Sequence, residues 1–180
     1  ALQKIYEFIW EEFCDWYIEL AKPMIYDREN PSRLEAQYVL NYVLSNSMKL
    51  LHPFMPFITE EIYQHLIDID ESIMISKWPE YREDYVFPDE VEKMELIMNA
   101  IKSIRNIRAE MNVPASRKTK LIFVSEKEDL GKVISEGEKY FTRLAGASEV
   151  VFQPDKQGIP STAVSGVIPG AQIYIPLEDL

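Results

Sequence analysis

The stretch Leu50–Leu66, LLHPFMPFITEEIYQHL, decides how the first half of the chain folds. Pro53 cannot donate a backbone hydrogen bond and disfavours helical geometry in the residue before it. Pro56 is followed within one turn by acidic residues, and this combination is typical of a helix start. The stretch therefore predicts a tight corner between two helices. The corner also carries four large apolar side chains, so we expect it to be packed into the core: Phe54, Met55, Phe57 and Ile58.

Two helices are predicted before the corner. Over residues 2–22 polar side chains recur every three or four positions and nearly all the others are apolar, which is typical of a helix buried over most of its circumference. Pro23 marks either the end of this helix or a kink. Residues 32–35, Ser-Arg-Leu-Glu, match a capping box, so a second helix should start there and continue to Leu51.

After the corner, a third helix should run over residues 56–68. Residues 72–80, SIMISKWPE, are predicted to be extended and to pack three apolar side chains against the bundle: Ile73, Ile75 and Trp78. The segment that opens at Pro88 carries proline and two acids in its first turn, and it should form a long helix that ends near Asn112.

The pattern changes after Arg117, where short apolar runs and turn signals replace helical periodicity. We expect strands at 120–125, 149–153, 162–167 and 172–175, with a helix at 127–144 after the first strand. The fold class is therefore α+β: an antiparallel helical bundle followed by a small α+β unit with three or four strands. The expected divisions are residues 1–87 for the bundle, 88–116 for a long connecting helix and turn, and 117–180 for the small unit.

Composition restricts the function. A net charge of −11 argues against binding nucleic acid with the whole surface, so any such contact has to be local. No apolar run approaches the roughly 20 residues of a membrane span. The single cysteine, Cys14, allows no internal disulfide and fits a reducing cytoplasm. Because the chain starts without methionine or a helix cap and ends at LEDL, we expect it to be a piece of a larger protein.

Residues 102–120 form a basic cluster that contains six cationic residues and one acidic residue, Glu110. Its members are Lys102, Arg105, Arg108, Arg117, Lys118 and Lys120. Arg105 and Arg108 fall on the apolar side of the predicted helix. They either pair with acids such as Glu60 or Glu61 and fix the helix to the bundle, or they contact phosphate through bidentate hydrogen bonds.

The start of the second helix is another candidate for nucleic-acid contact. Arg33, Leu34 and Gln37 lie beside a polar loop, at a helix N-terminus that attracts phosphate. The alternative is an ordinary solvated first turn.

The sequence contains no pattern typical of catalysis or metal binding. Glu61 and His65 are spaced like two metal ligands, but the HExxH pattern is absent. His52 is expected to bond a backbone group at the corner. No glycine-rich phosphate loop opens a helix. We therefore assign no catalytic residue, no metal and no cofactor to this chain.

Four segments resemble the anticodon-binding region of the valyl-tRNA synthetase family, and the resemblance covers essentially the whole chain. They are FCDWYIELAKP (Phe13–Pro23), the corner Leu50–Leu66, ISKWPE (Ile75–Glu80) and IRNIRAEMNVP (Ile104–Pro114). The resemblance implies a parent enzyme of class I that joins valine to its tRNA using ATP, monomeric and cytoplasmic, with its catalytic domain outside this chain. It also implies a bundle truncated at its N-terminus and a chain that leads toward a C-terminal coiled coil.

The resemblance implies a valine-specific tRNA as the partner. No association with a membrane is expected. The residues expected to contact tRNA are Arg33, Leu34 and Gln37, followed by Arg105 and Arg108. The alternative function is an acidic helical protein–protein interaction domain that binds no RNA.

Overall fold

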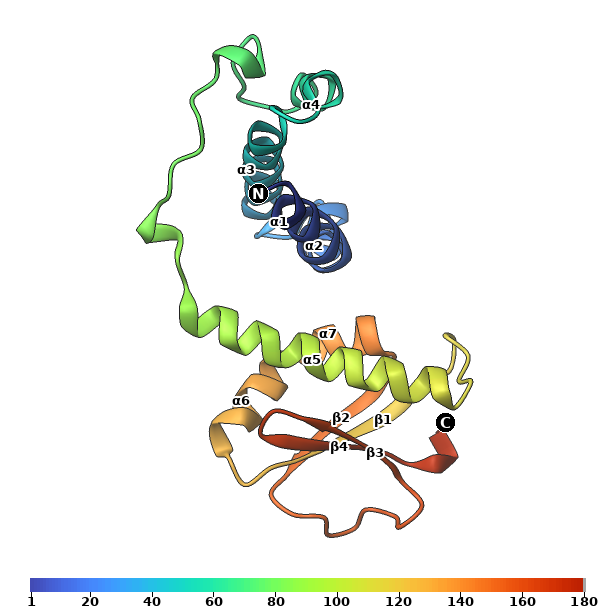
Figure 1. The fold of residues 1–180 in the computed structure, drawn as a ribbon. Coiled ribbons are helices and arrows are strands. Elements are labelled where there is room, and N and C mark those ends of the chain that lie inside the picture. Colours follow the sequence, from blue (N-terminus) through green and yellow to red (C-terminus); the bar gives the residue numbers. More distant parts are fainter. Residues whose placement is uncertain (180) are drawn as a thin grey trace. The chain divides into compact units, whose positions relative to one another are not determined.

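The computed structural model describes residues 1–179 and divides the chain into two compact units, Ala1–Asp84 and Tyr85–Leu180 (Figure 1). The first unit is helical, and the second combines helices with a four-stranded sheet. This confirms the predicted α+β fold. Among the described residues, no helix is long and apolar enough to cross a membrane.

The first unit begins with a continuous helical segment that changes its winding in the middle. Its parts are α1 (Leu2–Glu7), a π-helix (Phe8–Ile18) and α2 (Glu19–Tyr26). Pro23 lies within α2, so the helix continues past the end expected near residue 22. The other helices are α3 (Arg33–Leu51), α4 (Pro56–Tyr63) and the 3-10 turn Ile73–Ile75, and a second 3-10 turn (Glu83–Tyr85) follows.

The core of the first unit joins α3, α4 and the first 3-10 turn. Met48, Tyr63 and Ile73 are buried together, one from each element. Partly buried apolar side chains surround them: Ile9, Leu44, Leu51, Ile62, Leu66 and Ile69. Because each element contributes one buried apolar side chain to this cluster, the cluster depends on all three elements.

The corner forms where it was predicted, with Pro56 as the first residue of α4. His52 nevertheless keeps helical backbone angles although Pro53 follows it. The expectation that the apolar corner is packed into the core is wrong: Phe54, Met55, Phe57 and Ile58 are exposed, Phe57 to 91%. The reason is that α4 turns Thr59 and Tyr63 toward the core, and a short helix has only one buried face.

The segment after α4 also differs from its prediction. Helix α4 ends at Tyr63, five residues before the expected Asp68, which has a positive φ of 54°. Of the three side chains expected to pack inward, only Ile73 is buried, whereas Ile75 and Trp78 are exposed.

The second unit opens with α5 (Pro88–Glu110), close to its predicted bounds. It continues with β1 (Thr119–Val124), α6 (Glu128–Glu136), α7 (Glu138–Tyr140), a π-helix (Phe141–Ala145), β2 (Ala147–Gln153), β3 (Val164–Ile168), β4 (Ala171–Ile175) and a 3-10 turn (Leu177–Asp179). The strand order is β2-β1-β4-β3. Strands β1 and β2 are parallel and connected through α6 and α7, and the other pairs are antiparallel.

Helix α5 packs on this sheet with one apolar stripe, so residues 88–116 contribute a core helix to the second unit (Figure 1). The buried stripe consists of Ile97, Ala100, Ile101, Ile104 and Ile107. Gly166 of β3 allows the close approach, because a Cβ there would lie 2.5 Å from the hydroxyl oxygen of Ser103.

Candidate nucleic-acid interface

The loop before α3 forms part of the first candidate surface for nucleic-acid contact. Ser32 makes no side-chain cap hydrogen bond, so the predicted capping box is wrong. Its backbone angles, φ −88° and ψ 10°, are not the extended angles typical of a capping serine. The side-chain oxygen of Asn30 accepts the Ser32 N–H at 3.0 Å, and Asp27 accepts the N–H of Glu29 at 3.0 Å. Two side chains from inside the loop therefore order it.

Arg33 ties this loop to the preceding helix. Its Nε donates to the backbone oxygen of Ile25 at 2.9 Å, and the side chain is half-buried. Leu34 beside it is 73% exposed. The structure therefore brings Arg33 and Leu34 together with Gln37, which lies one turn later, at the start of α3.

Gln37 lines a hollow of about 420 Å³ in the first unit. Its walls are mostly apolar: Phe13, Ile18, Ile25, Leu40, Leu44, Leu66 and Ile67, with the amides of Gln37 and Asn41. Asn41 is held in place because it donates to the Ile67 oxygen at 2.9 Å and accepts the Ile67 N–H at 3.1 Å. An apolar hollow with an amide at its wall can take a flat ring and hydrogen-bond its edge.

Arg108 lies in the second unit and is only 8% exposed. Its guanidinium donates to Thr119 Oγ1 at 3.2 Å and to the backbone oxygens of Pro114 at 3.0 Å and Arg117 at 2.8 Å. Burial lowers the pKa of Arg108 from its ordinary value. Arg108 thus stabilises the turn between α5 and β1. Its hydrogen bonds go to this turn and not to Glu60 or Glu61, the partners suggested from the sequence.

Arg105 is exposed, and its Nε donates to the backbone oxygen of Leu144 at 2.8 Å. Arg105 and Arg108 line one cleft together with Lys118 and Arg143. Sequence reasoning counted Lys118 in the basic cluster but missed Arg143. No periodicity could have found Arg143, because it comes from a different helical segment and meets α5 only through the fold.

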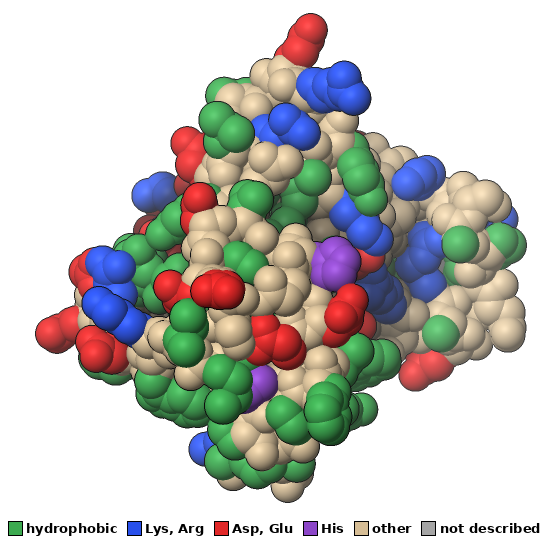
Figure 2. All heavy atoms as spheres, turned by 90° about the horizontal axis from the view of Figure 1, so that it is seen from above, with side chains coloured by type: hydrophobic (Ala, Val, Ile, Leu, Met, Phe, Trp, Pro, Cys, Tyr) green, Lys and Arg blue, Asp and Glu red, His purple; other side chains and the backbone are tan. Residues whose placement is uncertain are grey.

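Both histidines bond groups within the first unit. His52 Nδ1 lies 2.8 Å from Thr59 Oγ1, and its Nε2 lies 3.0 Å from Met74 Sδ. The expected backbone partner for His52 is therefore wrong, whereas His65 does have one, donating from Nδ1 to the oxygen of Glu61 at 2.8 Å. Both histidine side chains are visible on the face shown in Figure 2, in purple. Among the side chains that the structure describes, no three His, Cys, Asp or Glu are grouped so that they could hold a metal.

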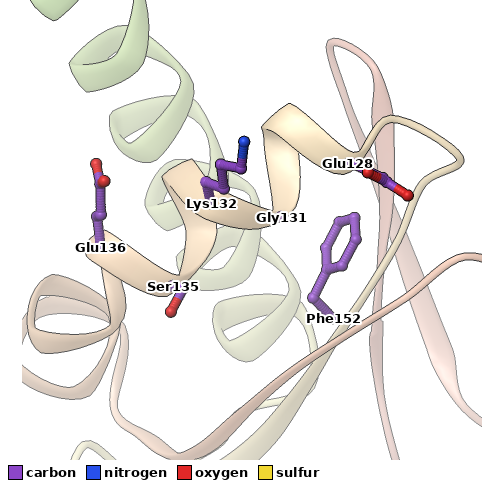
Figure 3. A pocket seen from close by; sticks show the side chains of 6 residues that line it. All are labelled: Glu128, Gly131, Lys132, Ser135, Glu136 and Phe152. Carbon is purple, nitrogen blue, oxygen red and sulfur yellow. The ribbon is translucent and has the colours of Figure 1, made fainter.

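A shallow hollow over α6 results from helix packing. Figure 3 shows the Phe152 ring below the helix, while Lys132 and Glu136 point away from that ring. A Cβ on Gly131 would lie 2.8 Å from the ring, so glycine lets α6 settle on β2. The polar side chains of this hollow do not converge on one point, which is what binding a ligand would require.

Comparison with known proteins gives a consistent result. A family model described as the anticodon-binding domain of tRNA ligase matches residues 1–123. The chain is 48% identical over 181 residues to the valine–tRNA ligase of Clostridium tetani, and 49% and 43% identical over 180 residues to those of Clostridium acetobutylicum and Carboxydothermus hydrogenoformans. In each comparison the whole of this chain is covered, but it spans only 20% of the relative's length.

Proposed function

This chain belongs to the family of anticodon-binding domains of tRNA ligases, and from that premise we propose that it is the tRNA-binding part of a valine–tRNA ligase. The complete enzyme would join valine to its tRNA using ATP, with the reacting groups outside these 180 residues. We also propose that this ligase is monomeric and works in the cytoplasm. The family assignment confirms the resemblance inferred from the four sequence segments.

The start of α3 is the proposed site of anticodon contact. The observation that carries this proposal is the apolar hollow that Gln37 lines, next to Arg33 and the exposed Leu34. An unpaired base can enter such a hollow and stack on apolar side chains, while the amide bonds its edge. Arg33 would meet a phosphate beside that base, because its guanidinium has donors besides the Nε that holds Ile25.

Arg105 and Arg108, the two candidate arginines of the second unit, have different roles in this proposal. Arg105 is exposed and is kept as a phosphate contact. Arg108 is buried, and its guanidinium already donates to three oxygens, so we assign it a supporting role behind Arg105.

Binding of a valine tRNA transcript tests the proposal. We expect salt-sensitive binding that weakens when the anticodon is altered, because base contacts specify and phosphate contacts only position. The change Arg33→Ala should lower affinity for the normal transcript, whereas Arg82→Ala, which removes an exposed arginine paired with Asp84, should not. The measurement is a filter-binding or fluorescence titration at low and moderate salt. Equal affinity for both transcripts would remove the claim of base reading.

One observation favours a second function for the first unit. The exposed corner around Phe57 is apolar, and large exposed apolar patches mark protein contacts. This fits the alternative of an acidic helical interaction domain, or contact with other parts of a much longer ligase. The titration separates the two functions, since a domain that only contacts protein does not distinguish the two transcripts.

A further inference from the structure

The second unit contains a groove lined by the first half of α5, the start of α6 and the turn between β3 and β4, three elements that Figure 1 shows. We call it the α5–α6 groove, and its volume is about 650 Å³. Its floor is formed by four apolar side chains: Leu96, Leu130, Val133 and Pro169. Leu130 is buried, and the other three remain at least partly exposed. A Cβ on Gly170 would lie 3.2 Å from Leu130 Cδ1, so the glycine keeps this end of the groove open.

The rim of the groove is acidic. Two lysines line it, Lys93 and Lys127, against four carboxylates: Asp89, Glu92, Glu95 and Asp129. Lys93 Nζ lies 3.0 Å from the carboxylate of Glu90, which does not line the groove, so the charge of Lys93 is already matched. Asp129 has a partner in Lys132 at 3.6 Å. Within the described part of the chain, no cation lies at ion-pair distance from the carboxylates of Asp89, Glu92 or Glu95.

The three acids of α5 repel one another. Asp89, Glu92 and Glu95 follow at intervals of three residues, so neighbouring carboxylates lie close together on the helix surface. The helix dipole favours acids only in the first turn, which accounts for Asp89 but not for Glu92 and Glu95. Among the described residues, no ion pair compensates this repulsion at Glu92 and Glu95, and a cationic partner would do so.

We propose that the α5–α6 groove binds a basic amphipathic helix of a protein, with apolar side chains on the floor and Lys or Arg side chains at the rim. The groove extends from Asp89 to Asn99, which is about 15 Å along α5 and suits about three turns of a bound helix. An apolar floor with charges beside it is how grooves bind amphipathic helices. The acidic rim repels phosphates, so charge complementarity favours a basic protein segment over RNA. This inference does not rest on the proposed function.

Binding of a model peptide to the whole 180-residue chain tests the inference. The probe is a fluorescein-labelled peptide with two Leu-Lys-Lys-Leu-Leu-Lys-Leu repeats, titrated at low salt by fluorescence anisotropy. Two further probes separate the contributions of floor and rim. One is a Leu/Glu peptide with the same apolar pattern, and the other is an oligolysine with the same number of lysines.

Neutralising the rim should weaken binding of the Leu/Lys peptide. The test variant removes three charges from the groove: Glu92→Gln, Glu95→Gln and Asp129→Asn. The control removes the same charge from exposed positions of the same unit outside the groove: Glu110→Gln, Glu138→Gln and Glu178→Gln. We expect the test variant to bind about tenfold more weakly and the control to change less than about twofold, because only the rim charges lie next to the peptide. Equal weakening in both variants overturns the inference, as does unchanged affinity of the test variant.

Filling the groove tests the floor without changing any charge. Asn99 is exposed and lines the groove, so Asn99→Trp should occupy it and weaken binding of the Leu/Lys peptide about fivefold or more, whereas Asn99→Ala should not. Equal affinities of these two variants overturn the inference. An oligolysine that binds as tightly as the Leu/Lys peptide also overturns it, because the floor then contributes nothing. A Leu/Glu peptide that binds as tightly does the same for the rim.

Sedimentation velocity separates a foreign helix from a second copy of the chain. We expect the original chain and Asn99→Trp to sediment alike. An original chain that self-associates, and loses this property with Asn99→Trp, would show a second copy in the groove and overturn the inference. The titrations with normal and altered transcripts are independent of this result: a chain that does not distinguish the transcripts should still bind the Leu/Lys peptide.

Discussion

The hydrogen bonds of His52 connect the corner to the core. Thr59 is fully buried, and its hydroxyl donates to the Met55 oxygen at 2.8 Å. That hydroxyl has only one hydrogen, so the Nδ1–H of His52 must be the donor to Thr59 Oγ1. His52 therefore sets both the end of α3 and the start of α4.

Replacing this histidine should destabilise the first unit. We expect His52→Ala to lower the free energy of unfolding by about 1–3 kcal/mol, because it leaves a buried hydroxyl oxygen without its donor. His65→Ala is the control, since His65 is exposed and bonds only within its own helical turn, and it should cost less than about 0.5 kcal/mol. Urea unfolding followed by tryptophan fluorescence reports on this unit, which contains Trp10, Trp16 and Trp78. Equal effects of both changes would contradict the assignment.

Gly146, Gly158 and Gly170 of the second unit all have a positive φ, and Gly146 is the one that lies against Arg108. We expect Gly146→Ala to cost about 1–2 kcal/mol from the left-handed angle alone, and more from contact with Arg108. Gly158→Ala is the control, because φ there is +79° but nothing lies within 4 Å of the added Cβ. Hydrogen exchange of the Thr119 amide, which donates to the Gly146 oxygen at 3.0 Å, measures the difference. Identical losses in both variants would show that the contact does not matter.

Single residues show where sequence reasoning reached its limit. The basic residues 102–120 were visible as a cluster, but the burial of Arg108 depends on carbonyls that the α5–β1 turn brings to it. In the same way, the apolar residues of the corner predict burial. Phe57 is nevertheless exposed, because no other element of the described unit covers it. Both outcomes are set by tertiary contacts, which local patterns do not contain.

At the scale of elements, the carboxylate of Glu60 joins α4 to the 3-10 turn after it. It accepts from Gln64 Nε2 at 2.7 Å and from Ser72 Oγ at 2.9 Å. These hydrogen bonds, with that of Gln64 the largest cause, lower the pKa of Glu60 below its ordinary value of 4.5. The ionised form is therefore favoured in the folded state.

This pKa direction gives a pH dependence. A carboxyl whose pKa is lowered on folding stabilises the fold above its unfolded pKa, and this contribution is lost as the pH falls through the lower folded value. We expect Glu60→Gln to be less stable than the original chain near pH 7, and the difference to shrink below about pH 4. Urea midpoints across this range measure it, with Glu61→Gln, an exposed neighbour, as control. A constant difference across the range would rule out the ionised carboxylate as the cause.

Elements with a chemical start signal were the best predicted. Pro88 and the acids after it placed the start of α5 correctly, and the four strands lie within three residues of their predicted bounds. Helix ends were less certain, since α2 passes through Pro23 and α4 stops at Tyr63. At the start of α5, Pro88 fits the first helical turn and the acids suit the positive end of the helix dipole, whereas the ends of α2 and α4 depend on what these helices pack against.

For the whole molecule, the charge distribution matters more than its sum. The net charge of −11 predicts that any RNA contact is local. The two candidate contact regions, at the start of α3 and at Arg105, lie in different units. A change at one region should therefore leave the fold of the other region intact.

The strand order β2-β1-β4-β3 also has a kinetic consequence. Strands β3 and β4 are joined by the tight Pro169–Gly170 turn, so they can pair within microseconds, as short hairpins do. Strand β1 pairs with two strands that are distant in the sequence: β2, which follows α6 and α7, and β4, which follows β3. The loop entropy of those closures opposes them, so the refolding rate of the second unit should be limited by the arrival of its central strand.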